Sequence, residues 1–381
     1  MFSGNDKISM RQVYRLFVFD LIGVCTLELP AKLSYFSGSD GLLSIVIGGG
    51  LASVYLWYLG RIVAGMKTDL VTYVNQSIPG WLARLILLFL SFHAMLEAGF
   101  GAYIFADVMK KGLIPEQSYT LILILILLAA AYAVCGGIES RARLYEVLFV
   151  VLAVGLVLMF LTAFSDMEWA YVGPFFKSSP GNLTKGALLE VFCFIPLFAV
   201  VFFPAYVKKE KEKQLIPTVM AALWSAVLVL FVLYLLLLGS FGSGALMHMR
   251  YPAVTLMSNI HLRSSFLKRF DAFMLGIWFF TLFALVNLYL FYGTKLLTAA
   301  FLPEETKEED ADAPDGHSKR SWISLGCMMA LAFLVAELFY YRDGEGLFLN
   351  YVCYLGMPLL VLLPGLALIV GKYRKKAAKG E

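Results

Sequence analysis

The sequence predicts an all-α integral membrane protein with ten transmembrane helices, and three observations support that fold class. The chain has 381 residues, of which 60% are hydrophobic and only 15% are charged, and its mean hydropathy is +0.78. It contains ten apolar stretches long enough to cross a bilayer. Two of these stretches, the first and the sixth, are interrupted by proline. The composition excludes an ordinary soluble enzyme, a disordered tail and a nucleic-acid-binding protein.

The ten predicted spans are separated by charged residues and by segments rich in glycine and proline. They lie near residues 12–35, 41–63, 81–108, 118–136, 144–164, 183–206, 216–240, 267–292, 321–341 and 348–371. No backbone polar group can stay unpaired in lipid, so each span is expected to be a helix. We expect a single transmembrane domain over residues 1–381, with one repeat at about 8–166 and a second at about 180–372.

The basic residues predict the orientation of the chain in the bilayer. With a cytoplasmic N-terminus, the connections on the inner side carry about twice as many of the 31 lysines and arginines as those on the outer side. Short cytoplasmic connections are enriched in these residues, so both termini are expected to be cytoplasmic. The acidic stretch at residues 304–315 is expected to be a solvated cytoplasmic loop.

The first and sixth spans carry residues that break a helix. In the first, Gly23 loosens the backbone, and Pro30 removes an amide and blocks the carbonyl of Thr26. In the sixth, Pro196 does the same to the carbonyl of Phe192. These spans are equivalent if ten helices form two halves of five, and matched broken helices indicate the site of an inverted-repeat transporter. The alternative is that each proline only kinks a packed helix.

The two breaks predict a binding site for a ligand with charged ends. Unwound backbone exposes amides that suit a carboxylate, and carbonyls that suit an ammonium group. The predicted site residues at the breaks are Gly23, Val24, Cys25, Thr26, Phe192, Cys193 and Phe194. His93 and Glu97, one helical turn apart on the third span, are expected to form one wall.

Charged residues inside a bilayer are costly and usually face an interior or an aqueous cavity. The ionisable residues within the predicted spans are Asp20, Glu28, His93, Glu97, Glu190 and Glu337. Three interpretations of the His93–Glu97 pair remain open: a proton relay, neutralisation of a structural glutamate, and contact with the ligand. Glu28 precedes Pro30 and is expected to line the cavity, whereas Glu337 near the outer end is expected to be structural or solvated.

The sequence shows no pattern for metal binding, cofactor binding or catalysis. The five cysteines lie in or beside apolar runs without metal-ligand spacing, and an odd number argues against a disulfide framework. No nucleophile–base set or phosphate-binding loop is recognisable. We therefore expect no metal, no cofactor and no enzymatic activity.

Residues 130–146 carry a motif that resembles a family pattern, Gly-Ile-Glu-x-x-x-Arg-Leu-x-Glu. The matching residues are Gly137, Ile138, Glu139, Arg143, Leu144 and Glu146. Weaker matches are the segment that begins Tyr251-Pro252 and continues to residues 270–273, and the pairs Ile22-Gly23 and Leu29-Pro30. On these residues the chain resembles the spore germination permease family, the membrane B subunit of nutrient germinant receptors, within the amino acid–polyamine–organocation superfamily.

The resemblance implies a LeuT-like fold of two inverted five-helix repeats that binds a small nutrient, typically an amino acid. It implies two partners besides the lipid bilayer, a larger A subunit and a lipoprotein C subunit, in the spore inner membrane. The motif residues Glu139, Arg143 and Glu146 lie at the inner end of the fifth span. We expect them to hold an inner gate or to contact the A subunit.

Three functions remain open from the sequence. The first is a germinant sensor that binds an amino acid and signals germination. The second is a secondary amino acid transporter driven by protons through His93, Glu97 or Glu190. The third is a passive conduit for water or ions within the same complex.

Overall fold

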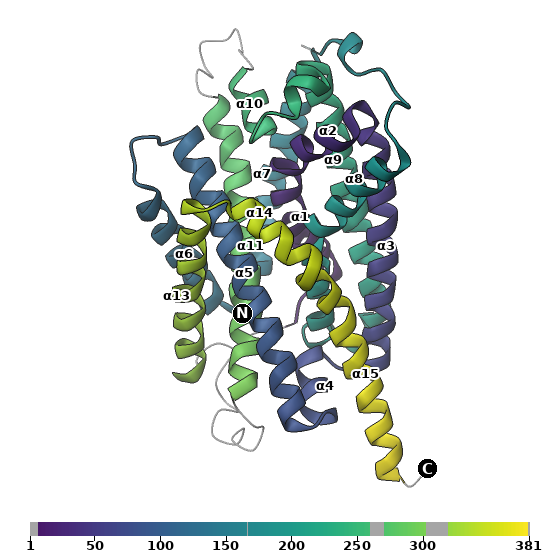
Figure 1. Cartoon of the computed structure of the whole chain (residues 1–381). Coiled ribbons are helices and arrows are strands. Elements are labelled where there is room, and N and C mark those ends of the chain that lie inside the picture. The colour runs from purple at the N-terminus through teal and green to yellow at the C-terminus, as the bar shows by residue number, and fades with distance from the viewer. Residues whose placement is uncertain (1–6, 166, 260–269, 302–318, 380–381) are drawn as a thin grey trace.

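The computed structural model describes residues 7–165, 167–259, 270–301 and 319–379, and these form a bundle of helices (Figure 1). The helices of the N-terminal part are α1 (Met10–Leu27), α2 (Leu29–Ser37), η1 (Gly38–Asp40), α3 (Gly41–Met66), α4 (Leu70–Ser77), α5 (Gly80–Gly112), α6 (Tyr119–Cys135) and α7 (Gly137–Ser165). Those of the C-terminal part are η2 (Trp169–Tyr171), α8 (Pro180–Cys193), η3 (Ile195–Ala205), η4 (Lys209–Gln214), α9 (Leu215–Leu246), α10 (Pro252–Asn259), α11 (Phe270–Phe301), α13 (Lys319–Tyr341), α14 (Gly344–Tyr351), η7 (Val352–Gly356) and α15 (Met357–Lys379).

The two ends of the bundle are named here by the helices that lie at each of them. Figure 1 shows α2 and α10 toward the top, and α4 and the end of α15 at the bottom. We call these the upper and the lower end.

Two predicted segments cannot be compared with the structure. The first residues of the predicted eighth span, at 267–269, and the acidic stretch at 304–315 lie outside the described residues.

Local sequence signals explain where several helices begin. Ser9 caps α1 in a capping box, in which the Ser9 hydroxyl and the Gln12 side chain each accept a backbone N–H of the other residue. Ser118 caps α6 through the amide of Leu121, and Ser179 precedes Pro180 at the start of α8. These caps satisfy amides that would otherwise be unpaired at the helix ends.

The described chain contains eight helical runs that are long and apolar enough to cross a membrane, fewer than the ten predicted. Two predicted segments account for the difference. The helix α1 is not among the eight because it carries three charged residues, Arg11, Arg15 and Asp20. The helix α6 is not among them because it is shorter, with 17 residues. The all-α membrane class is confirmed, and the count of ten is not confirmed.

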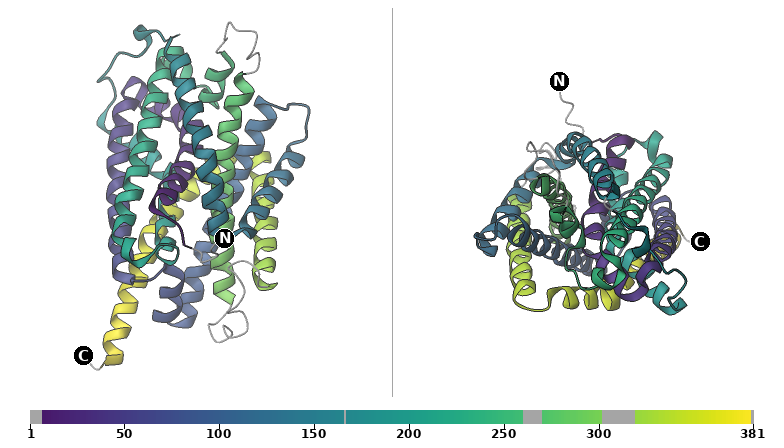
Figure 2. Two further views of the ribbon diagram at one scale, coloured as in Figure 1. Left: turned by 180° about the vertical axis from the view of Figure 1, so that it is seen from behind. Right: turned by 90° about the horizontal axis from the view of Figure 1, so that it is seen from above.

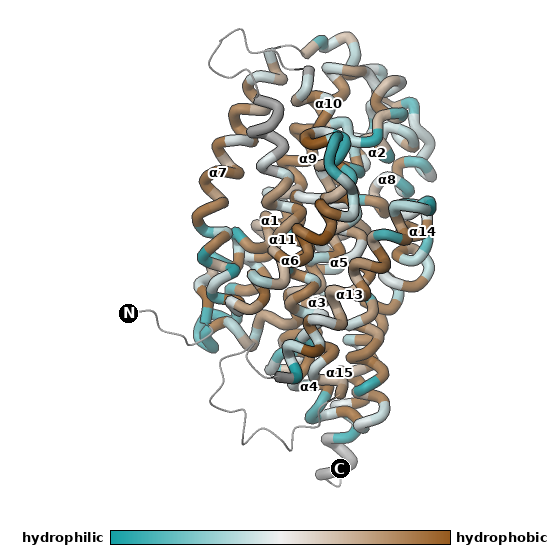
Figure 3. The backbone as a smooth tube through the Cα atoms, turned by 90° about the vertical axis from the view of Figure 1, so that its left-hand side faces the viewer, coloured by the Kyte–Doolittle hydropathy of each residue, from teal (hydrophilic) through white to brown (hydrophobic). Residues whose placement is uncertain are grey.

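Two central helices organise the packing of the bundle. The helices α5 and α11 pack most extensively against each other, while α1 packs on α9 and α3 packs on α8. The runs that contain α5, α8–η3 and α11 are largely buried, whereas α7, α13 and α15 keep much of their apolar surface exposed. The right-hand view in Figure 2 shows the bundle from above, and Figure 3 shows hydrophobic residues along α7 above a more hydrophilic lower end. Exposed apolar faces of this kind suit contact with lipid.

Candidate ligand-binding site

A central cavity lies where the α1–α2 junction meets α5, the end of α8, α11 and α14. It contains about 640 Å³ of space not occupied by atoms, part of it open to solvent. The polar residues of its lining are Asp20, Glu28, Lys32, Glu97 and Glu345. Its aromatic residues are Phe100, Phe192 and Phe348. This combination of an apolar wall with a few polar groups is typical of small-molecule sites.

The first break lies at Glu28, later in the chain than predicted. Residues 23–26 remain helical in α1, and the Glu28 amide still donates to the Val24 carbonyl at 3.1 Å. Pro30 falls in the first turn of α2, where proline is tolerated because no intrahelical N–H bond is needed. The expectation of unwound backbone at Gly23–Thr26 was therefore wrong, because Pro30 begins a second helix.

The predicted residues of the first span differ in their surroundings. Val24 lines the central cavity. Gly23 packs on the backbone of Thr281 in α11, where an added Cβ would lie 3.3 Å from the carbonyl carbon. Thr26 is buried, and its hydroxyl donates to the Ile22 carbonyl at 2.7 Å and accepts from the Trp278 indole at 2.9 Å. Cys25 is also buried and does not belong to the lining.

The second break lies where it was predicted, at the end of α8. The helix ends at Cys193, and the chain continues as the 3₁₀ helix η3, which has 11 residues and Pro196 in its first turn. A 3₁₀ run of that length is uncommon and marks a departure from α-helical hydrogen bonding. Phe192 and Cys193 line the central cavity, whereas Phe194 is fully buried behind it. The expectation that Phe194 lies at the cavity wall was wrong.

His93 and Glu97 lie side by side on α5 and are both buried. Their Nε2 and Oε1 atoms are 3.6 Å apart, and neither atom has a hydrogen-bond partner. His93 Nδ1 lies 2.9 Å from the hydroxyl of Tyr351, just before the π-helical turn η7. Glu97 lines the central cavity, while His93 lines a second one.

The second cavity, here called the lower cavity, lies below the central one along the same elements. It contains about 340 Å³ of space between α5, η3 and α11. Most of its wall is apolar, but His93, Tyr289 and Tyr292 also line it. The Tyr289 and Tyr292 hydroxyls are buried without a hydrogen-bond partner.

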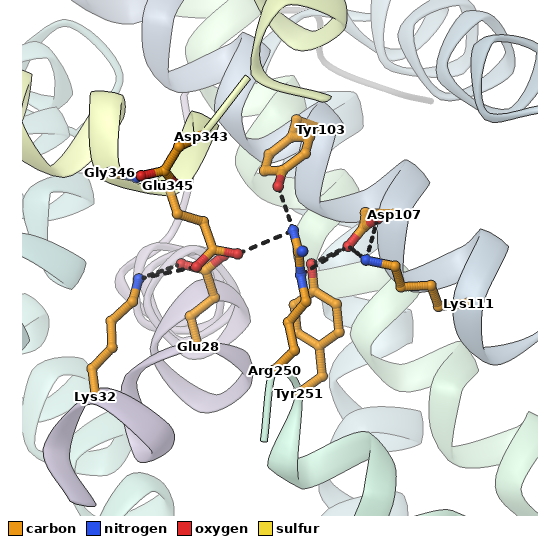
Figure 4. Close-up of polar contacts among 10 residues, drawn as sticks. All are labelled: Glu28, Lys32, Tyr103, Asp107, Lys111, Arg250, Tyr251, Asp343, Glu345 and Gly346. Atoms are coloured by element: carbon orange, nitrogen blue, oxygen red, sulfur yellow. Dashed lines mark hydrogen bonds and ion pairs between the residues drawn. The ribbon is translucent and has the colours of Figure 1, made fainter. Parts of the chain in front are cut away.

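A layer of ion pairs lies at the upper side of the central cavity (Figure 4). Lys32 Nζ is 3.0 Å from Glu28 Oε2 and 3.9 Å from Glu345 Oε2. Arg250 Nη2 is 3.2 Å from the other oxygen of Glu345, so the layer joins α2, α14 and the segment before α10. Above it lies an upper cavity of about 550 Å³, which Glu28, Lys32 and Glu345 also line. These three residues therefore separate the two cavities.

The same layer is anchored to the upper part of α5 through Asp107. Its buried carboxylate lies 3.2 Å from Arg250 Nε and accepts from the Tyr251 hydroxyl at 2.7 Å. Lys111 contributes an ammonium group at 2.8 Å. Burial raises the pKa of Tyr251 well above its usual range, so its phenol stays protonated and donates to Asp107.

Two further clusters connect α1 with α7 below the central cavity. Arg141 donates to Asp20 at 2.5 Å, and both side chains are buried. At the lower end, Glu146 pairs with Arg15 at 2.9 Å and also with Arg11, so the start of α1 is tied to α7. The other predicted gate residues, Glu139 and Arg143, form an i,i+4 pair at 2.8 Å.

Sequence reasoning missed Arg141, Lys32, Glu345 and Arg250 as site residues. Lys32 is one turn after Glu28, which is a local signal for an ion pair. Nothing in the sequence relates Arg141 to Asp20 or Arg250 to Glu345, because those contacts depend on how distant helices pack. Glu190 lines none of the three cavities and instead faces Gly48 of α3.

Glu337, the last of the predicted ionisable residues, contacts a neighbouring helix. Glu337 accepts a hydrogen bond from Thr120 at 2.8 Å, in line with a structural role. Within the described residues, no group of three or more histidine, cysteine, aspartate or glutamate side chains is placed to hold a metal ion.

Comparison with known proteins identifies relatives over nearly the whole chain. The model of the family described as "Spore germination protein" matches residues 7–308. Spore germination protein YndE of Bacillus subtilis (strain 168) is 21% identical over 392 residues, covering 100% of both chains. Spore germination protein GerLB of Bacillus cereus is 22% identical over 382 residues, covering 99% of this chain and 98% of that one. Spore germination protein A2 of B. subtilis is 20% identical over 303 residues, covering 76% and 80%.

A solved structure shares the fold. It is a substrate-bound outward-open state of a Na⁺-coupled sialic acid symporter, with a TM-score of 0.66 and 14% sequence identity. The match covers 94% of this chain and 78% of that chain. At this identity the similarity concerns the fold alone, and it confirms the predicted LeuT-like class. The division into repeats at 8–166 and 180–372 stays a prediction.

Proposed function

Because the chain belongs to the spore germination protein family, we propose that it is the membrane subunit of a spore nutrient germinant receptor. It binds a small nutrient, an amino acid, in the central cavity, and occupancy of that cavity signals germination. The family and the names of the relatives support a role in spore germination. The observation that carries the ligand class is the set of groups that line the cavity.

Three features of the central cavity fit an amino acid. Lys32 is a basic residue of its lining and suits a carboxylate. Glu97 has a carboxylate oxygen without a partner and suits an ammonium group. The aromatic wall of Phe100, Phe192 and Phe348 suits an apolar side chain. An α-amino acid carries all three of these groups on one small framework.

The predicted site residues divide into two groups under this proposal. Val24, Glu97, Phe192 and Cys193 contact the ligand, because they line the cavity. Gly23, Cys25, Thr26, His93 and Phe194 support those residues from behind, since none of them belongs to the lining.

Signalling requires that the ligand favour one of two conformations. A ligand shifts such an equilibrium only by its difference in affinity for the two states. The proposed moving contacts are the ion-pair layer above the cavity and the Glu146 cluster below it. Glu139 and Arg143 are the proposed contact with the A subunit, because Arg143 is 45% exposed. The chain works with that subunit and the lipoprotein C subunit in the spore inner membrane, with its lower end and both termini toward the cytoplasm.

A thermal-shift screen of the purified full-length protein against amino acids and several sugars tests the ligand. Saturable stabilisation by an amino acid is expected, because a ligand that binds only the folded state raises the melting temperature. The screen is repeated on the complex with its co-expressed partner subunits. No shift in either preparation would contradict the proposal.

The alternative function is a proton-coupled secondary amino acid transporter. What favours it is the order of three cavities along the bundle, with the His93–Glu97 pair between the central and the lower one. Uptake of the stabilising amino acid into proteoliposomes separates the two functions. A transporter accumulates the labelled ligand under a proton gradient, whereas a receptor subunit binds it without net flux.

A further inference from the structure

Glu97 and His93 stand between two cavities that have different characters. Glu97 lines the central cavity, which carries the charged groups, and His93 lines the mostly apolar lower cavity. We propose that the ligand's ammonium group displaces one proton from Glu97, and that this proton leaves through the central cavity, which is partly open to solvent. The inference rests on the proposed function, because it requires a ligand with a cationic group in the central cavity.

Glu97 holds its proton while the cavity is empty, because none of the lysine and arginine side chains that the structure describes forms an ion pair with it. The titratable groups around it are His93 on α5 itself, Tyr289 on α11, Tyr351 on α14 and Cys193 on α8. An isolated carboxylate in such surroundings is costly, so the neutral form is favoured.

The charged groups across the central cavity are already paired. Asp20 is bound to Arg141, and Glu345 to Arg250. Lys32, the basic group among the described residues of the lining, is bound to Glu28 at 3.0 Å. The ammonium group of a ligand therefore brings the missing positive charge to Glu97.

The transfer balances in protons and charge. The ligand's N–H groups donate to the Glu97 carboxylate, which favours the ionised form. The O–H bond of Glu97 breaks, and the proton passes to water in the central cavity and from there to solvent. His93 stays neutral, because its Nε2 atom, 3.6 Å from Glu97 Oε1, is buried and a charged imidazole there would be costly. The contact of His93 Nδ1 with the Tyr351 hydroxyl at 2.9 Å fixes the ring orientation.

The lower cavity is not suited to receive the proton, because most of its wall is apolar. A buried water needs two to four polar partners and enough space. His93 Nε2, Tyr289 Oη and Tyr292 Oη are buried with almost no accessible surface, so they offer a water in this cavity no polar partners. When the ligand leaves, Glu97 takes a proton back from water in the central cavity.

The test measures how binding depends on pH. The probe is an equimolar mixture of neutral L-amino acids, whose net charge does not change near neutral pH. Thermal shifts of the full-length protein give the apparent dissociation constant, and a pH dye in weakly buffered solution counts released protons. Loss of one proton on binding predicts about tenfold tighter binding per unit rise in pH, as long as free Glu97 is protonated.

Two variants test whether Glu97 is the residue that loses the proton when the ligand binds. Glu97→Gln should bind more weakly, release no proton and show no pH dependence. Glu190→Gln is the matched control, because Glu190 is also buried with unpaired oxygens but lies outside the central cavity, and it should keep the wild-type pH dependence. Infrared spectra of the wild type give a second readout, in which the band of a protonated carboxyl disappears when the mixture is added.

The outcomes distinguish a failure of this inference from a failure of the proposed function. Stabilisation without pH dependence or proton release in the wild type overturns the inference and leaves the proposed function standing. A pH dependence that survives in Glu97→Gln, or that is lost in Glu190→Gln, assigns the proton elsewhere and also overturns it. No stabilisation at any pH, either of the protein alone or of its complex with the partner subunits, contradicts the proposed function, and the inference fails with it.

Discussion

Arg141 of α7 and Asp20 of α1 form a buried ion pair directly below the central cavity. The Nη2–Oδ1 distance is 2.5 Å, and the side chains are 2% and 1% exposed. The same guanidinium donates to the carbonyl of Ala284 in α11 at 3.3 Å, so one side chain joins three helices. Asp20 lines the central cavity. The pair therefore connects the cavity to the packing of α1, α7 and α11.

Replacing Arg141 by methionine should destabilise the protein strongly. The change leaves the Asp20 carboxylate buried without its partner, and breaking a buried pair in this way typically costs about 3 to 5 kcal/mol. Denaturant unfolding in detergent measures the loss. Arg143→Met is the matched control on the same helix, and its exposed pair with Glu139 predicts a loss below about 1 kcal/mol.

The double variant Asp20→Leu with Arg141→Met checks the reason for that loss. It removes both charges, so it should recover much of the stability that the single variant loses. Equal stability of Arg141→Met and Arg143→Met would contradict the role assigned to the buried pair.

The sequence was sufficient for those features that depend on local pattern. Apolar runs predicted the membrane class. The prolines predicted the breaks, because a proline lacks a backbone N–H and so disrupts hydrogen bonding within the helix that contains it. The position of the first break was wrong by a few residues, since Pro30 can either unwind the preceding turn or begin a new helix, and only packing decides. The contacts of Arg141 with Asp20 and of Lys32 with Glu345 span more than a hundred residues. Their geometry follows from the packing of helices, which periodicity does not specify.

Glu345→Gln should open the path between the upper and the central cavity. Glu345 holds both Lys32 and Arg250, and partly exposed pairs of this kind contribute about 1 kcal/mol. Losing that amount raises an open population roughly fivefold. Cys193 lines the central cavity and reports the change through its rate of reaction with a charged thiol reagent added from outside.

That measurement uses a protein in which the other four cysteines are serine. Glu337→Gln is the control, because Glu337 is bonded to Thr120 on α6 and lies outside the layer. An unchanged reaction rate of Cys193 in Glu345→Gln would show that the layer does not limit access.

Glu146→Gln should loosen the lower end of α1. Glu146 accepts from Gln12 at 3.2 Å and pairs with Arg11 and Arg15, so the neutral side chain weakens the attachment of α1 to α7. Amide hydrogen exchange in the first turns of α1 should become about fivefold faster, as expected for the loss of about 1 kcal/mol. Glu139→Gln, in the neighbouring i,i+4 pair, should leave that exchange unchanged. Similar exchange in both variants would remove Glu146 from the proposed gate.

Val24→Trp should abolish stabilisation by amino acids while the protein still folds. Val24 is the residue of the predicted segment Gly23–Thr26 that lines the central cavity, so an indole there occupies space that the ligand needs. The contacts of Gly23 and Thr26 with α11 remain, because they lie outside the cavity lining. Val54→Trp is the control, since Val54 is 63% exposed on α3 and should tolerate the larger side chain. Thermal shifts with the amino acids compare the two variants. Wild-type stabilisation of Val24→Trp would place the ligand outside the central cavity, and the roles given to Glu97, Phe192 and Cys193 would fall with it.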